Sequence, residues 1–304
     1  MSDTTYILGI DGGGSKTDAV ILDERGNVVG AGLGGGCNAN FMSRRAAGAS
    51  YKRAIKAALK EAGISADMIA KAGCTFGSVA DQVFAELGIL VKAKAYSEYP
   101  VAFERAGIRE LRGVALVAGT GSSCVAVDPG KGVVSAGGWG PIFGDEGSAY
   151  DIGLQGIKKS LLAQEGRSPE TLLSQEMRDY FGSDRARGAM RKLFDNKINQ
   201  TFIAGFAVRV SKAAAAGDQV SKEIIESAAE SLGELAAFVA RKYFNEHDAF
   251  PFVLAGGVFN IGKPVVDPIR AVLRPQFPAS KIIVADRRPG EAVARLVARE
   301  DFTC

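Results

Sequence analysis

The chain has 304 residues, of which 47% are hydrophobic and 23% are charged, as is usual for a globular protein. Its formal net charge is only +3 and no basic stripe alternates with aromatic residues, so nucleic acid is not an expected partner. Apolar runs stay far below the ~20 residues of a membrane-spanning helix. Four scattered cysteines without a CxxC pair, and a start without a secretory signal, predict a reduced cytoplasmic protein with no membrane partner.

The first half of the chain alternates short apolar runs with turns and then with helical patterns. Gly63 follows the first helical pattern and Pro100 precedes the last, as is common at helix ends and starts. The order is strand, strand, strand, helix, strand, helix, strand, helix. The predicted elements are strands over 7–10, 19–22 and from 28, a helix over 45–62, a strand over 72–76, a helix over 79–87, a strand over 89–96 and a helix over 101–106.

The second half begins at Gly113 and repeats the same opening, which makes an internal duplication. Helices are inserted before the strand pattern resumes, and the length favours two domains. The predicted elements are strands over 114–118, 124–127 and 132–136, helices over 148–164, 169–181, 185–194, 201–216 and 220–244, a strand over 252–255, a helix over 264–273, a strand over 281–285 and a helix over 289–299.

Each repeat carries a loop of small residues between its first two strands, at 11–17 and at 119–123. Backbone amides exposed in a tight turn bind anions, phosphate above all. The first loop is not a P-loop, because Ser15 separates Gly14 from Lys16 and a strand follows instead of a helix. Both loops also lack the last glycine of the dinucleotide fingerprint. Two phosphate-binding hairpins therefore remain as the prediction.

These loops resemble known motifs. Residues 10–17 are similar to the phosphate-1 loop of the actin, hexokinase and Hsp70 superfamily, 119–122 to its phosphate-2 loop, and 253–258 to its adenosine loop. Residues 137–140 and 144–150 resemble the N-acetylglucosamine kinase family, within a broader BadF-type ATPase group. The resemblance spans essentially the whole chain. It implies an α/β fold of two duplicated ribonuclease-H-like (actin-like ATPase) lobes with a nucleotide cleft between them.

The resemblance also implies domain limits and chemistry. The N-terminal lobe is expected over 1–112, with the last helix (289–304) packing back on it, and the C-terminal lobe with its helical insertion over 113–288. The implied activity is transfer of a phosphoryl group from ATP, with Mg²⁺, to the 6-hydroxyl of an amino sugar, N-acetylglucosamine being the favoured acceptor. The aligned nucleotide-binding residues are Gly12, Gly13, Gly14, Ser15, Lys16, Thr17, Thr120, Gly121, Ser122, Gly256 and Gly257.

Other positions match sugar or metal contacts of the family. Asp11 would hold the water shell of Mg²⁺. Trp139, the only tryptophan, is placed beside the sugar, with a core or hinge position as the alternative, and Asp145 is also a candidate N-cap for the helix beginning at Ser148. The aligned substrate-binding residues are Asn38, Glu98, Gly138, Trp139 and Asp145.

Glu98 marks a departure from the family pattern. The family has Asn-Asp-Ala before this helix, with the aspartate as general base, whereas this chain has Ser97-Glu98-Tyr99. Glu98 is predicted to be catalytic as the substitute base, and a helix N-terminus should favour its ionised form. A salt-bridged surface role, or a different acceptor, is the alternative.

Three other functions stay open. A glucosamine kinase would carry the same local motifs. A BadF-type ATPase that activates a partner enzyme would need cysteines for an iron–sulfur cluster, and Cys124 has no companion nearby in the sequence. A sugar-responsive repressor would need a helix-turn-helix, for which no room is expected before the strand at Tyr6. The oligomeric state is open, a homodimer included.

Overall fold

The structure is a computed structural model that describes residues 5–38, 42–183 and 199–299. The predicted helix over 185–194 lies outside these residues. The chain forms two compact units, called unit 1 (1–111 with 285–304) and unit 2 (112–284). The junctions fall at 111/112 and 284/285, so residues 285–288, which the sequence places in the C-terminal lobe, belong to unit 1.

Unit 1 contains a five-stranded mixed sheet in the order β3-β2-β1-β4-β5. β1 pairs antiparallel with β2 and parallel with β4, while the outer pairs are β2–β3 (antiparallel) and β4–β5 (parallel). The strands are β1 (Tyr6–Gly12), β2 (Lys16–Leu22), β3 (Val28–Gly35), β4 (Ile69–Cys74) and β5 (Ala93–Ala95). The helices are α1 (Arg44–Ala62), α2 (Ala80–Leu87), α3 (Glu98–Arg105) and α11 (Pro289–Ala298), with 3₁₀ turns at Ala66–Met68 and Gly77–Val79.

Two boundaries differ from the predicted ones in a way that affects the site. β5 is three residues long instead of eight. α3 begins at Glu98, so Pro100 is its third residue and does not open the helix. Proline is tolerated there because the N–H groups of the first turn have no partner within the helix. Ser97, in extended conformation, is the N-cap residue that precedes the helix.

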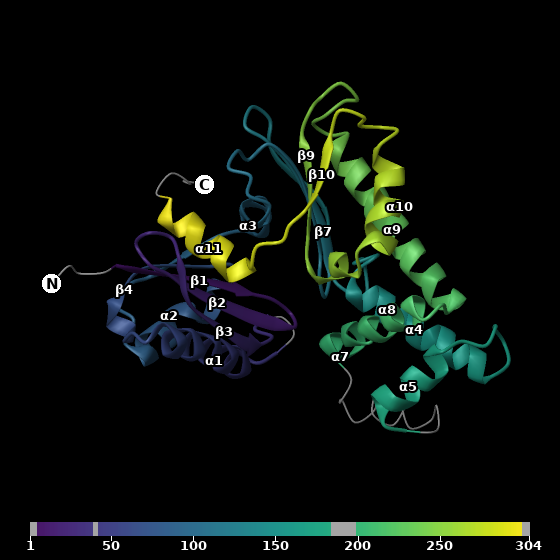
Figure 1. The fold of residues 1–304 in the computed structure, drawn as a ribbon, viewed down its shortest axis with the longest axis horizontal. Coiled ribbons are helices and arrows are strands. Elements are labelled where there is room, and N and C mark those ends of the chain that lie inside the picture. Colours follow the sequence, from purple (N-terminus) through teal and green to yellow (C-terminus); the bar gives the residue numbers. More distant parts are fainter. Residues whose placement is uncertain (1–4, 39–41, 184–198, 300–304) are drawn as a thin grey trace. The chain divides into compact units, whose positions relative to one another are not determined.

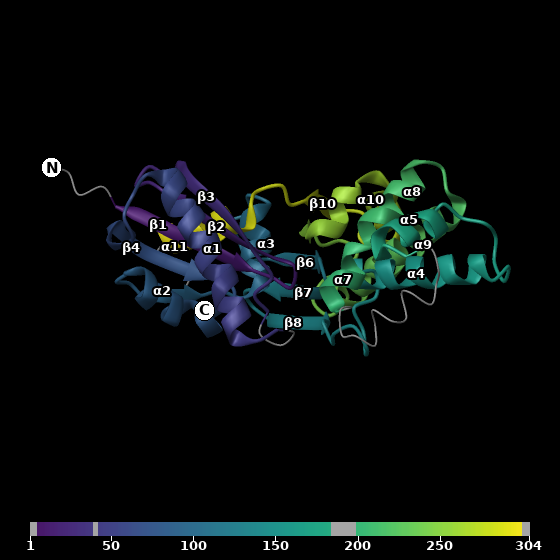
Figure 2. The same cartoon turned by 90° about the horizontal axis from the view of Figure 1, so that it is seen from below.

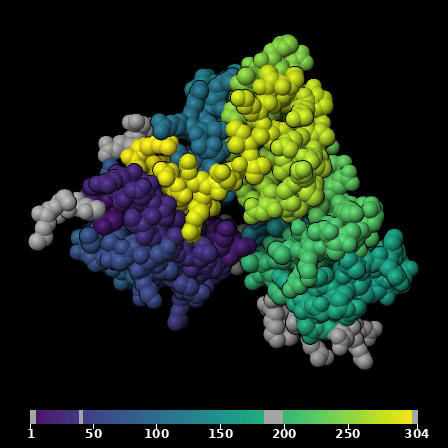
Figure 3. Space-filling model, viewed as in Figure 1, coloured from purple at the N-terminus to yellow at the C-terminus, as the bar shows by residue number. Residues whose placement is uncertain are grey.

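The alternation of side chains along β1 divides the core of unit 1 into two layers. Leu8 and Ile10 pack with α1 and α2 on one face, and Ile7 packs with α11 on the other. Figures 1 and 2 show α1 and α11 on opposite faces of this sheet, and Figure 3 shows the yellow C-terminal helix against the purple first strands. At Gly9 a β-carbon would lie 2.2 Å from the amide nitrogen of Ala294, so only glycine permits this approach.

The start of α11 is fixed to β2 by a buried carboxylate. Asp18 accepts a hydrogen bond from Nη2 of Arg288 at 2.5 Å and another from the amide of Gly290 at 3.0 Å. Asp18 lies opposite Asp11 in the β1–β2 pairing. The C-terminal helix is therefore attached directly behind the first glycine-rich hairpin.

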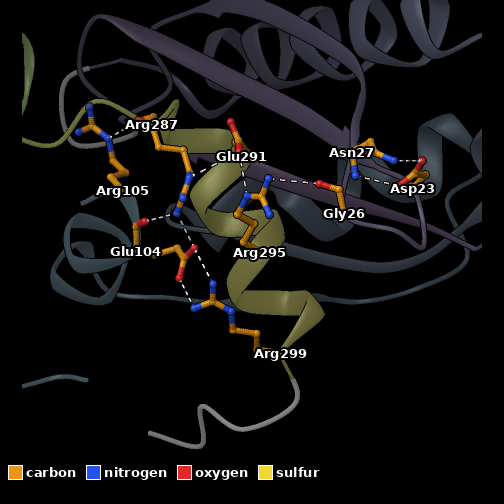
Figure 4. Close-up of polar contacts among 9 residues, drawn as sticks. All are labelled: Asp23, Gly26, Asn27, Glu104, Arg105, Arg287, Glu291, Arg295 and Arg299. Carbon is orange, nitrogen blue, oxygen red and sulfur yellow. Dashed lines mark hydrogen bonds and ion pairs between the residues drawn. The ribbon is translucent and has the colours of Figure 1, made fainter. Parts of the chain in front are cut away.

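A second cluster joins α11 to α3 (Figure 4). Glu104, whose side chain is 1% exposed, binds Nη1 of Arg287 at 2.7 Å and Nη2 of Arg299 at 3.0 Å. A further bond links Glu104 to Nη1 of Arg299. Arg295 reaches the carbonyl of Gly26 and pairs with Glu291. Charged contacts, not only apolar ones, therefore fix the helix that carries Glu98.

We expect Glu104→Gln to lower the free energy of unfolding by ~1–3 kcal/mol, because it weakens the charged hydrogen bonds to the half-buried Arg287 and Arg299. Burial raises the pKa of Glu104, so the charge itself is held at a cost that limits the loss. Urea unfolding measures the change. Glu110→Gln is the matched control, since Glu110 is exposed just after α3 and loses the same charge. If the two variants are equally stable, the cluster does not contribute to stability.

Unit 2 repeats the sheet of unit 1 strand for strand, in the order β8-β7-β6-β9-β10 with the same parallel and antiparallel pairings. The predicted duplication is thereby confirmed. The strands are β6 (Gly113–Ala118), β7 (Ser122–Asp128), β8 (Gly132–Gly137), β9 (Pro251–Ala255) and β10 (Lys281–Val284).

The helices of unit 2 lie mostly between β8 and β9. The predicted helix over 201–216 is two helices that meet at Phe206, after the weak helix former Gly205. In the described ranges no helix is both long enough and apolar enough to cross a bilayer. The helices are α4 (Ala149–Gln164), α5 (Leu173–Phe181), α7 (Gln200–Gly205), α8 (Ala207–Ala215), α9 (Gln219–Ala240) and α10 (Lys263–Leu273), with the 3₁₀ helix η3 (Gly257–Ile261).

Candidate active site

The β1–β2 hairpin is closed by backbone bonds and leaves its tip exposed. The amide of Gly13 donates to the carbonyl of Lys16 at 2.9 Å, and Ser15 and Lys16 are exposed. Thr17 is completely buried and its hydroxyl donates to the carbonyl of Gly35 at 2.8 Å. The side chain of Thr17 therefore supports the hairpin, where the sequence predicts a phosphate contact.

Asp11, at the end of β1, is held by a residue that the sequence did not reveal. The hydroxyl of Thr75 donates to Oδ1 of Asp11 at 3.0 Å and accepts from the amide of Gly12 at 2.9 Å. Thr75 follows β4 directly, and β4 is the parallel neighbour of β1, so adjacent carboxyl ends are the signal that could have found it. No hydrogen bond from the described residues reaches Oδ2 of Asp11, which is free for a ligand.

Burial raises the pKa of Asp11, and the Asp18 carboxylate acts in the same direction. The hydrogen bond from Thr75 and the charges of Arg105 and Lys16 oppose this rise only in part. Ionised Asp11 is thus held at a cost to the fold, as is common for functional carboxylates.

Glu98 is the first residue of α3 and is exposed at the surface of unit 1. The surrounding protein nevertheless removes enough water to raise the pKa of Glu98, and the Asp11 carboxylate adds to the rise. The expectation that the helix N-terminus lowers the basicity of Glu98 is therefore wrong. The two carboxylates share one electrostatic environment, and the raised pKa makes Glu98 a stronger base than an ordinary glutamate.

The β6–β7 hairpin of unit 2 is attached to the start of α4. The amides of Ala149 and Tyr150 donate to the carbonyls of Gly119 and Thr120 at 2.9 and 3.2 Å. The hydroxyl of Ser122, a buried residue, donates to the carbonyl of Glu146 at 2.8 Å. As with Thr17, the Ser122 hydroxyl stabilises the hairpin, although a phosphate contact was expected of it.

Asp145 is buried beneath this hairpin. Its Oδ1 accepts from the amide of Ser122 at 3.3 Å, and a β-carbon at Gly121 would lie 2.7 Å from its Oδ2. Burial raises the pKa of Asp145, partly offset by the amides of Ser122 and Gly140. The predicted N-cap role is wrong, because Ser148 caps α4 by accepting from the amide of Asp151 at 3.2 Å.

The loop between β8 and α4 exposes large apolar side chains. Trp139 is 75% exposed, and Ile142 and Phe143 are more than 80% exposed. The core alternative for Trp139 is therefore excluded. The amide of Gly138 donates to the carbonyl of Ser122 at 2.8 Å, which ties this loop to the β6–β7 hairpin. Asn38 is in unit 1, half-buried in the loop after β3.

Gly256 and Gly257 follow β9 and differ in their surroundings. Gly256 has φ +121°, and a β-carbon there would lie 2.1 Å from the carbonyl oxygen of Ala118. Gly257 begins η3, and a β-carbon there would meet nothing within 4 Å. Gly256 is required by the close packing against Ala118, whereas at Gly257 the backbone lies next to open space.

The predicted site residues thus form a group in each unit. Unit 1 brings together Asp11, the hairpin tip and Glu98, while unit 2 brings together the β6–β7 hairpin, Asp145, the Trp139 loop and, beside β6, Gly256. A model of the BadF/BadG/BcrA/BcrD ATPase family matches residues 8–289. The chain belongs to this family.

Curated relatives and solved structures align with nearly the whole chain. It is 29% identical over 286 residues to an N-acetylmuramic acid/N-acetylglucosamine kinase of Clostridium acetobutylicum, covering 91% of this chain and 93% of that one. It is 26% identical to an N-acetyl-D-glucosamine kinase of Dictyostelium discoideum, covering 97% and 98%. A structure titled putative N-acetylglucosamine kinase from Chromobacterium violaceum superimposes with a TM-score of 0.73 at 21% identity, covering 97% and 99%, which shows the shared fold.

In this member of the ATPase family, Gly256→Ala should affect stability and Gly257→Ala should affect ATP binding. Gly256→Ala should lower the free energy of unfolding by ~1–3 kcal/mol, because of its positive φ and its contact with Ala118. Gly257→Ala should leave stability within ~0.5 kcal/mol but weaken ATP binding if adenosine lies against it. Thermal unfolding and ATP titration separate the two effects. Unchanged ATP affinity in Gly257→Ala would remove this residue from the nucleotide site.

Proposed function

We propose that the protein is an ATP-dependent sugar kinase that phosphorylates the 6-hydroxyl of an amino sugar, with N-acetylglucosamine as the acceptor. The observation that carries the proposal is that two carboxylates, Asp11 and Glu98, lie near enough to interact electrostatically, with Asp11 at the base of a glycine-rich hairpin whose tip is exposed. The names of the two relatives, both aligned over more than nine-tenths of the chain, support an amino-sugar acceptor.

Glu98 would orient the 6-hydroxyl and accept its proton. Phosphoryl transfer passes through a loose transition state, in which positioning and charge stabilisation matter most. A general base still contributes typically ~10²–10⁴-fold. The raised pKa of Glu98 suits this role better than the lowered one expected from a helix terminus alone.

Mg²⁺ fits the unit 1 site because it prefers oxygen ligands and usually keeps several waters. Oδ2 of Asp11 accepts no hydrogen bond from the described residues, while Thr75 fixes Oδ1. Asp11 would hold the hydrated ion, which supplies neutralisation of the phosphate charge. Thr75 would keep the carboxylate aimed at it.

The remaining predicted residues divide into two roles. The exposed tip of the first hairpin at 14–16 and residues Thr120 and Gly121 of the second would bind phosphates. Gly12 and Gly13, whose amides bond to Thr75 and Lys16, would support them together with Thr17 and Ser122. Gly256 and Gly257 would lie against adenosine. Asn38, Gly138, Trp139 and Asp145 would contact the sugar. The exposed ring of Trp139 would cover an apolar sugar face, and Asp145 would accept hydrogen bonds from its hydroxyls.

Coupled ADP release tests the function. Purified protein with Mg-ATP is assayed against N-acetylglucosamine, glucosamine, N-acetylmuramic acid and glucose, and ³¹P NMR identifies the product. We expect release that depends on N-acetylglucosamine and a 6-phosphate product. Preference for glucosamine would correct the acceptor. ADP release at one rate with and without sugars would instead favour an ATPase that acts on a partner protein.

A further inference from the structure

We propose that Arg105 is a further catalytic residue, whose guanidinium group binds the phosphoryl group while it is transferred to the acceptor. This inference rests on the kinase function proposed above. Three features carry it: the position of Arg105 on α3, the way its head group is held, and its unpaired charge.

Arg105 and Glu98 lie on the same side of α3. They are seven residues apart, so they are separated by two turns, about 10.5 Å along the axis and only about 20° around it. The Asp11 carboxylate interacts electrostatically with each of them. A base, a metal-holding carboxylate and a cation therefore act on one region of unit 1.

The orientation of the Arg105 head group is fixed by a reciprocal pair of hydrogen bonds. Nε of Arg105 donates to the carbonyl of Arg287 at 2.9 Å (Figure 4), and the amide of Arg287 donates to the carbonyl of Arg105 at 3.3 Å. In the part of the chain that the structure describes, neither Nη atom of Arg105 makes a hydrogen bond. Both Nη groups of this oriented guanidinium are thus available to bind a ligand.

Among the described residues no carboxylate contacts Arg105 directly, unlike its neighbours, although Asp11, Asp18 and Asp286 attract its charge from farther away. Arg287 and Arg299 pair with Glu104, and Arg288 pairs with Asp18, which also accepts from Gly290. Arg105 is half-buried, yet no carboxylate among the described residues lies within 4.0 Å of it. Burial lowers the pKa of Arg105, so the cation is held there at a cost.

An unpaired guanidinium at such a place is complementary to an anion, because charges removed from water are normally paired. A phosphoryl group fits best, since a guanidinium binds phosphate oxygens through two parallel N–H···O bonds. Asp11, also nearby, is the residue proposed to hold the metal of Mg-ATP.

In the proposed step the 6-hydroxyl oxygen forms a bond to the γ-phosphorus and the bond to the β,γ-bridging oxygen breaks. The hydroxyl proton passes to Glu98, and ADP leaves with the electron pair of the broken bond. Negative charge spreads over the three equatorial oxygens in the transition state. A cation placed there lowers the barrier more than it strengthens substrate binding.

The first test compares Arg105→Met with Arg109→Met in the full-length protein. Arg109 is exposed in the segment after α3, so it controls for the loss of one positive charge. We expect Arg105→Met to lower kcat by ~10³-fold, at the lower end of the effect of arginines on transferred phosphoryl groups. KM for the sugar should change little and Arg109→Met should be active. Arg105→Lys should recover only part of kcat, since an ammonium lacks the planar fork.

Equilibrium binding gives a readout that a structural role would not move. The probes are Mg-ADP alone and Mg-ADP with aluminium fluoride, a mimic of the transferred group. Arg105→Met, or Arg105→Lys if the first variant melts early, should weaken binding of the fluoride complex while leaving Mg-ADP affinity unchanged. Equal weakening of both probes, or of neither, would overturn the proposal. Because this assay needs no sugar, a wild-type protein inactive on every sugar would contradict the kinase function without affecting this test.

Discussion

Glu98→Gln should lower kcat by ~10²–10⁴-fold while KM for ATP changes little, because the amide keeps the size of the side chain but cannot accept the proton. Glu98→Asp should retain far more activity, since it keeps the carboxylate and shortens the side chain by one C–C bond, about 1.5 Å. Steady-state kinetics on the identified acceptor, with Glu110→Gln as the exposed control, measure both effects.

The pH profile adds a check on the same residue. Burial and the Asp11 carboxylate raise the pKa of Glu98, so kcat/KM should fall on acidification at a higher pH than an ordinary glutamate would give. Wild-type rates in both Glu98→Gln and Glu98→Asp would show that Glu98 is not the base. Asp145, a buried carboxylate among the predicted substrate residues, would then be the next candidate.

Asp11→Asn should reduce Mg-ATP-dependent turnover by roughly 10²–10³-fold, the effect of removing one group that stabilises transition-state charge. The free energy of unfolding of this variant should instead be equal to or higher than that of the wild type. The raised pKa means that the folded protein binds this proton more tightly than the unfolded chain does, so stability from this group is present at low pH and is lost as pH rises through its titration range. At neutral pH asparagine removes that cost.

Kinetics at saturating Mg-ATP and thermal unfolding at neutral pH measure the two effects of Asp11→Asn, with exposed Asp67→Asn as the control. An inactive protein at least as stable as the wild type is the expected result. Wild-type kcat in Asp11→Asn would show that the β1–β2 hairpin does not serve phosphoryl transfer.

The features that could be predicted from the sequence are the local ones. Apolar runs and glycine turns predicted most of the strands and both hairpins, because such patterns act over a few neighbours, whereas the two-lobe fold came from the family resemblance. β5 was overestimated since it is a short edge strand, and the start of α3 was misplaced because Pro100 is compatible with more than one position in the first turn.

The missed residues act through contacts between distant segments. Thr75 reaches Asp11 across 64 positions, and Arg105 meets Arg287 across 182. No spacing rule connects such residues before the fold is known. The hydroxyls of Thr17 and Ser122 illustrate the converse case, in which residues of a binding motif are used to hold its backbone in shape.

The packing of α11 on unit 1 determines when the core of unit 1 can be completed during translation. α3 and α11 each follow the fifth strand of their own repeat, yet both pack in unit 1. Ile7, Val20 and Leu22 of β1 and β2 share one buried cluster with Val293 and Leu296 of α11, which are translated only after all of unit 2. Unit 1 therefore completes its core only after unit 2 has been synthesised, contrary to the usual N-to-C order of domain folding, and in the nascent chain this apolar face stays uncovered until then.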